Sequence, residues 1–170
     1  MNQRLPALFQ KNHALYRTES DDEKLVYFSV RKIEELLTQI LLKFFLKSPS
    51  SEKDALFDDG KPLNYFSAKI SAAERLGLIS SGLAAELRTV RRIKKEFKNR
   101  LDCTDLEYKE ARSLCENLWA PARMKNQPEL LNGSFPDTPR GNFELTAVIL
   151  TSLLENILEY TDETGNIPLH

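Results

Sequence analysis

The sequence is poor in the residues on which most catalytic centres depend. Only two histidines occur among the 170 residues, His13 and the final residue, His170. A Ser-His-Asp or Cys-His arrangement would have to use His13, and no nucleophile-elbow or oxyanion pattern accompanies it. We interpret His13 as a surface or partly packed residue. The sequence therefore predicts no catalytic residues and a protein that is not an enzyme.

Cysteine is equally scarce. Cys103 and Cys115 are the only two, too far apart for a Cys-x-x-Cys motif, and two thiols make no disulfide framework. We expect both to be reduced, which favours a cytoplasmic location. Two thiols and one interior imidazole match no structural zinc pattern, and no glycine-rich phosphate loop is present. We expect neither a bound metal nor a cofactor.

Long apolar runs and a strong net charge are also missing. The most apolar stretches carry charges every few residues, so we expect no membrane-spanning segment and no membrane partner. Hydrophobic residues make up 41% and charged residues 29% of the chain, and the net charge is -1. This composition predicts a single soluble domain over residues 1–170, with no global field that draws it to nucleic acid.

What the chain does have is helical periodicity. Between residues 21 and 47, apolar side chains recur at steps of four and three, which predicts a long central helix with one buried side. Ser20 and Glu23 have the spacing of a capping box at its start. The next periodic segments predict a helical hairpin over residues 61–100. Pro62 suits the first turn of this hairpin, Gly77 the end of its first helix and Ser80 or Ser81 the cap of the second.

The second half of the chain continues the helical pattern with one interruption. We expect a helix over residues 104–118, a proline-rich loop over residues 119–142 with four of the eight prolines, and a C-terminal helix over residues 143–160. No segment has a convincing period of two. The sequence therefore predicts an all-α fold, a single helical bundle of about six or seven helices.

The segment from Gly60 to Asp102 resembles a known family. The runs GKPL at residues 60–63, FSAKI at 66–70, LGLI at 76–79 and VRRIKKEF at 90–97 occur in that order. With the long apolar helix before them, they resemble the mannitol operon repressor (MtlR) family. The resemblance implies an all-helical bundle and a role in bacterial transcriptional regulation, without a helix-turn-helix or other standard DNA-reading element.

A more distant resemblance is to helical domains of the HEPN type, many of which are ribonucleases. Those nucleases carry an Arg-x-x-x-x-His motif where this chain has Lys94 and Asn99. Lysine could still hold a phosphate as a point charge, but asparagine cannot serve as a general acid or base. The resemblance therefore implies a catalytically inactive relative.

One electrostatic feature points to a binding surface. Five basic residues fall on one side of the second hairpin helix, opposite its apolar side: Arg88, Arg91, Arg92, Lys95 and Lys98, which together form the basic stripe. The stripe is suited to phosphates or to an acidic partner surface. The alternative is an ordinary solvated face, stabilised by the helix dipole and neutralised by Glu107 and Glu110 of the neighbouring helix.

Trp119 is the second candidate contact residue, because tryptophan and exposed prolines are useful in recognition surfaces. The alternative is that Trp119 seals one end of the bundle. The leading functional hypothesis is a non-enzymatic bacterial regulator that acts by protein-protein contact, with a homodimer as one option. The second hypothesis is nucleic-acid binding through the basic stripe, as an inactive relative of HEPN ribonucleases in a toxin-antitoxin or defence system.

Overall fold

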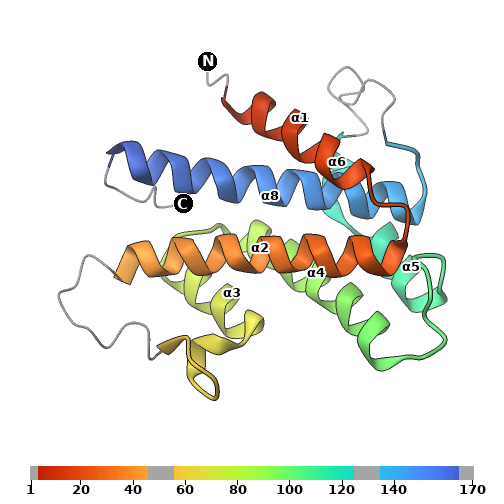
Figure 1. Cartoon of the computed structure of the whole chain (residues 1–170), viewed down its shortest axis with the longest axis horizontal. Coiled ribbons are helices and arrows are strands. Elements are labelled where there is room, and N and C mark those ends of the chain that lie inside the picture. Colours follow the sequence, from red (N-terminus) through yellow and green to blue (C-terminus); the bar gives the residue numbers. More distant parts are fainter. Residues whose placement is uncertain (1–3, 46–55, 125–134, 165–170) are drawn as a thin grey trace.

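The computed structural model describes residues 4–45, 56–124 and 135–164. Every regular element in these ranges is helical, which confirms the predicted all-α bundle (Figure 1). The α-helices are α1 (Arg4–Arg17), α2 (Asp22–Phe45), α3 (Phe66–Arg75), α4 (Ser81–Asn99), α5 (Lys109–Glu116), α6 (Trp119–Met124) and α8 (Pro139–Thr164). A short 3-10 helix, η2 (Pro62–Asn64), precedes α3.

The two longest helices, α2 and α8, form the centre of the bundle and pack against each other. Helix α1 crosses α8 on the side away from α2, while α3 and α4 pack against α2 (Figure 1). Helices α5 and α6 close one end against α8. The predicted apolar side of α2 is the middle of the core, since Val26, Val30, Ile33 and Leu37 are fully buried.

Helix α2 agrees closely with the predicted central helix over residues 21–47, of which residues 46 and 47 lie outside the described ranges. The capping prediction was wrong by one residue. The cap is Asp21, whose carboxylate accepts a hydrogen bond from the Lys24 N–H at 2.8 Å. Aspartate and serine cap equally well, and the helix begins directly after the aspartate, so Ser20 does not take the capping position.

Helices α3 and α4 pack together as the expected hairpin. Pro62 lies in η2, one turn before α3 begins, so the prediction that it starts the helix was wrong. Gly77 ends α3 as expected, with φ +70° and the Leu78 N–H donating to the Ala73 carbonyl at 2.9 Å. This is the closing bond of a Schellman motif, which needs the left-handed conformation that glycine adopts readily. The Ser80 hydroxyl then caps α4 by accepting a hydrogen bond from the Leu83 N–H at 3.3 Å.

The expected loop over residues 119–142 needs correction at both ends. It contains α6 from Trp119, and α8 already begins at Pro139, four residues before the predicted start at 143. The prolines misled the prediction because the first turn of a helix tolerates proline, whose missing N–H has no partner there in any case. Residues 125–134 of the predicted loop lie outside the described ranges. The helix expected over residues 104–118 is the shorter α5.

Sequence reasoning missed α1. Its buried positions are Leu8, Asn12 and Tyr16, so a polar residue occupies the centre of the face that meets α8. The Asn12 amide donates to Ser152 at 3.1 Å, and the Tyr16 hydroxyl lies 2.6 Å from the Thr151 hydroxyl. A helix that docks through buried polar contacts shows only a weak apolar period, which is the signal that predicts helices.

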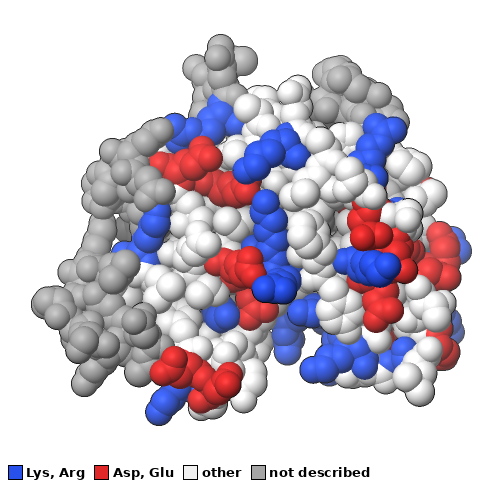
Figure 2. Space-filling model, viewed as in Figure 1, with Lys and Arg blue, Asp and Glu red and all other residues white. Residues whose placement is uncertain are grey.

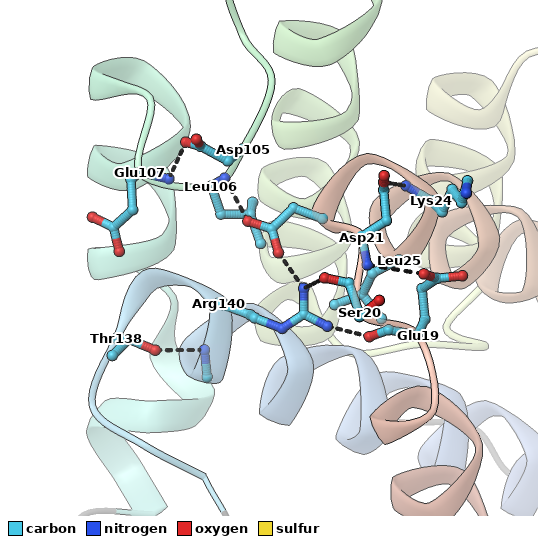
Figure 3. A network of polar contacts seen from close by, with 12 residues as sticks. Glu19, Ser20, Asp21, Lys24, Leu25, Asp105, Leu106, Glu107, Thr138 and Arg140 are labelled. Atoms are coloured by element: carbon cyan, nitrogen blue, oxygen red, sulfur yellow. Dashed lines mark hydrogen bonds and ion pairs between the residues drawn. The ribbon is translucent and has the colours of Figure 1, made fainter.

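A polar junction joins four segments at the start of α8 (Figure 3). The guanidinium of Arg140 donates to the carbonyls of Glu19 and Ser20 and pairs with the carboxylate of Asp22. The same carboxylate accepts a bond from the Leu106 N–H at 2.9 Å. Arg140 therefore ties α8 to the α1–α2 connection, to α2 and to the segment before α5.

Candidate interaction surface

The basic stripe lies on the outward face of α4. The opposite face supplies the core, since Leu87, Val90 and Ile93 are fully buried. Four stripe residues are exposed, and none of their side chains takes part in an ion pair or hydrogen bond within residues 4–45, 56–124 and 135–164: Arg91, Arg92, Lys95 and Lys98. In Figure 2, basic atoms line the lower right of the molecule, where the C-terminal half of α4 lies in Figure 1.

Arg88, the fifth member, has a structural partner. Its guanidinium pairs with the carboxylate of Glu74 on α3, so it holds the two hairpin helices together. Of the two carboxylates that the alternative interpretation named, Glu107 pairs with Arg112 at 3.4 Å, and Glu110 acts on Arg100 and Cys103. The charges of Arg91, Arg92, Lys95 and Lys98 therefore remain available to another molecule.

Carboxylates gather around Cys103, just after α4 ends. The pKa of the Cys103 thiol is raised to about 11, first by burial and then by four surrounding carboxylates: Glu96, Asp105, Asp102 and Glu110. Figure 2 shows Asp and Glu atoms, with Lys and Arg atoms among them, at the right of the molecule above the basic margin. The unpaired cations of α4 (Arg91, Arg92, Lys95 and Lys98) therefore form a short basic row that ends near these carboxylates.

The two positions of the HEPN-type motif have different surroundings. The Lys94 ammonium lies 5.5 Å from the ring centroid of Tyr27 on α2, a cation–π contact at the edge of the basic stripe. Asn99 is the exposed last residue of α4. The Asn99 amide has no titrating proton, so this position cannot serve as a general acid or base.

Trp119 is half-buried and begins α6. Its indole N–H donates to the Gly82 carbonyl at 3.4 Å, and the Arg123 guanidinium lies 4.9 Å from the ring centroid. Its main-chain N–H donates to the Glu86 carboxylate at 3.0 Å, as does that of Ala120 at 3.3 Å. These contacts fasten α6 to α4, and they favour the interpretation that Trp119 seals the bundle.

Glu86 is the residue of this region that sequence reasoning missed. It is only 3% exposed, and burial raises its pKa, although the bonds from Trp119 and Ala120 oppose the rise. The signal was present in the sequence, because Glu86 lies three residues after Leu83 and four before Val90, on the apolar side of α4. A carboxylate at such a position needs buried donors, and here it caps the start of α6.

His13 packs at the junction of α1 and α8. Its ring contacts that of Phe135 at a centroid distance of 4.6 Å, and its Nε2 atom lies 3.9 Å from a carboxylate oxygen of Glu144. This agrees with the interpretation of a partly packed histidine. Cys103 and Cys115 are free but buried, and burial raises the pKa of Cys115 to about 12.

A shallow cleft of about 460 Å³ lies between α2 and α3. Its charged groups pair with one another, since Lys69 binds Glu34 at 2.9 Å and Arg31 binds Glu35 at 2.9 Å. No group of three or more potential metal ligands occurs in the part of the chain that the structure describes. None of the described helices is long and apolar enough to cross a membrane.

The fold defined by these helices is a bundle built on two long helices, with a hairpin packed on one of them and a crossing helix on the other. No known family model matches the chain, and no curated protein matches it. A chain of the X-ray structure of the MtlR–HPr complex from Escherichia coli shares the fold, with a TM-score of 0.64 and 13% identity. The match covers 87% of this chain and 98% of that one. It confirms an MtlR-like fold.

Proposed function

We propose that this protein is a non-enzymatic regulator that acts by binding another protein through its surface. The observation that carries the proposal is the fold shared with a chain solved as part of a protein-protein complex, over 98% of that chain's length. The exposed charges on α4 support it, because they have no partner within the described residues. Function on this fold would then reside in contact surfaces rather than in a reactive centre.

The surroundings of the reactive side chains support a role outside catalysis. His13 is packed against Phe135, and the raised pKa values of Cys103 and Cys115 keep both thiols protonated near neutral pH. The nucleophile in thiol chemistry is the thiolate. These residues are therefore better suited to packing than to reaction.

We also propose the finer assignments of the MtlR-like resemblance. They are a single cytoplasmic domain over residues 1–170, a bacterial origin and a part in transcriptional regulation. Because the MtlR-like resemblance implies no standard DNA-reading element, this role would be exerted through a protein partner. The partner can be a different protein or a second copy of the chain.

The proposal is tested by capture from a lysate of the cells that encode the chain, with both proteins and nucleic acids identified. HPr, named in the neighbouring complex, is a candidate to add as purified protein. We expect a protein that is retained specifically and then binds the purified chain in isothermal titration calorimetry. Retention of nucleic acid alone, or RNA cleavage by the purified chain that requires Asn99 or His13, would contradict the proposal.

Nucleic-acid binding is the second candidate function. It is favoured by one observation, the row of unpaired cations on α4. Phosphate contacts release counterions, so binding of this kind weakens steeply as salt rises. Fluorescence anisotropy with labelled DNA and RNA duplexes at low and moderate salt measures it, and absence of binding at low salt would remove this candidate.

A further inference from the structure

The unpaired cations of α4 form a short row. From Arg91 to Lys98 the helix rises by about 10 Å. The one carboxylate within this stretch, Glu96, pairs with Arg100 at 2.9 Å and leaves the row itself basic. Arginine is enriched in protein interfaces and binds carboxylates through two parallel hydrogen bonds. The row is therefore suited to a partner with a few carboxylates in a small area.

An apolar side chain follows the row. Leu101 comes directly after the cap residue of α4, three residues beyond Lys98, and its relative exposure is 104%. A single exposed leucine is common on protein surfaces. This one follows Lys98, which has no partner in the described chain, by three residues, so an apolar side chain comes after the charged row. Protein interfaces combine apolar anchors with a charged rim in this way.

The length of the row separates a protein partner from a nucleic acid. A DNA duplex carries one negative charge for about every 1.7 Å of its axis, so it extends far past a row of about 10 Å. Beyond Lys98 it would approach Asp102, Asp105 and Glu110, which act on Cys103, and the whole chain carries a net charge of -1. A compact acidic patch on a folded protein would avoid this repulsion.

We propose that Arg91, Arg92, Lys95, Lys98 and Leu101 form a docking face for a protein that presents carboxylates around an apolar recess. This proposal rests on the proposed function, because it assumes a protein partner. It adds which surface of this chain binds the partner and which chemical groups the partner presents. Electrostatic complementarity of this kind raises the association rate and excludes wrong partners more than it raises affinity.

The probe is a fluorescent amphipathic peptide of glutamate and leucine, compared with a copy in which glutamine replaces glutamate. Binding to the purified full chain is measured by fluorescence anisotropy, beside a DNA duplex of similar length. We expect the acidic peptide to bind and the glutamine copy to bind far more weakly. Added salt should weaken the binding of the acidic peptide. The duplex should bind more weakly than the acidic peptide.

The test variant combines Arg91→Glu, Arg92→Glu and Lys95→Glu. Its matched control, Lys24→Glu with Lys61→Glu and Lys109→Glu, makes the same change of net charge at exposed lysines of α2, of the segment before α3 and of α5. We expect the test variant to bind the acidic peptide at least about tenfold more weakly, since three attractions become repulsions. The control should lose much less affinity for the acidic peptide. Circular dichroism checks that both variants are folded.

Three outcomes overturn the proposal: no binding of the acidic peptide, equal weakening by the two variants, and a duplex that binds more tightly than the peptide through the docking face. Leu101→Ser tests the apolar anchor, and we expect severalfold weaker binding with an unchanged salt dependence. In the lysate experiment, a partner retained equally by the test variant would contradict the docking face while the proposed function stands. Failure to retain any protein would contradict the proposed function itself.

Discussion

The side of the bundle where α1 meets α8 and the outward face of α4 use charged residues in different ways. Between α1 and α8, the Glu155 carboxylate binds Lys11 and Lys32 at 3.2 Å each and the Asn12 amide at 2.9 Å. Burial raises its pKa, but these partners outweigh burial and leave the pKa below its ordinary value. On α4, Arg91 and Lys95 have no such partner in the described chain.

The difference shows what the two sets of charges contribute. A buried charge must be paired within the protein, and it then fixes how helices meet. An exposed charge without a partner adds little to stability and keeps its interaction energy for another molecule. Substitutions that compare the two sides should therefore separate effects on folding from effects on binding.

The largest effect should come from the junction at the start of α8. Arg140→Gln removes the cation that pairs with Asp22 and the donor to two main-chain carbonyls, in a partly buried place. We expect a loss of about 2–4 kcal/mol in the free energy of unfolding, measured by urea denaturation. Arg91→Gln is the matched control on α4 and should change it by less than about 0.5 kcal/mol. Equal losses of unfolding free energy in the two variants would contradict the view that the paired charge stabilises the fold and the exposed one does not.

A second effect concerns the close approach at the same junction. A Cβ atom at Gly141 would overlap the carbonyl oxygen of Pro136, whereas one at Gly82 in α4 would meet no atom within 4 Å. Gly141→Ala should therefore lower the melting temperature, with a cost of about 1–3 kcal/mol. Gly82→Ala should leave it unchanged or raise it, because alanine favours the helix. A stable Gly141→Ala protein would show that the approach relaxes easily.

A smaller, pH-dependent effect should come from Glu86, which lies between the core and α6. Its folded-state pKa is raised by burial, so its interactions contribute most below the ordinary glutamate pKa. As pH rises from the ordinary pKa of glutamate to the raised pKa, Glu86 ionises in the unfolded state before it ionises in the folded state. Its contribution to the free energy of unfolding is then lost. Wild-type protein should therefore lose stability relative to Glu86→Gln across that window in denaturation at several pH values. A difference in unfolding free energy between the two proteins that does not change with pH would contradict the raised pKa of Glu86.

Local signals in the sequence were enough for a large part of this fold. The apolar period of α2, the hairpin of α3 and α4, the left-handed Gly77 and the Ser80 cap all depend on residues within a turn or two of one another. Local reasoning failed where a helix lacks a clear apolar period, as in α1, and where prolines begin helices, as in α6 and α8.

The candidate surface divides in the same way. The sequence alone placed the five basic residues of the stripe on one side of a helix, because helical geometry fixes that arrangement. The tertiary structure assigned Arg88 to Glu74, placed Lys94 over Tyr27 and gave Glu86 its bonds from α6. Each of these pairs joins two elements that meet only when the bundle forms.

The amino-acid order thus determined the helical class, the central helix and the position of the basic row. Packing alone decided which charges are satisfied inside the protein and which stay exposed to a partner. The physical reason is distance along the chain: periodicity and caps are short-range properties, whereas Arg140 and Asp22 lie 118 residues apart and pair only through the docking of α8.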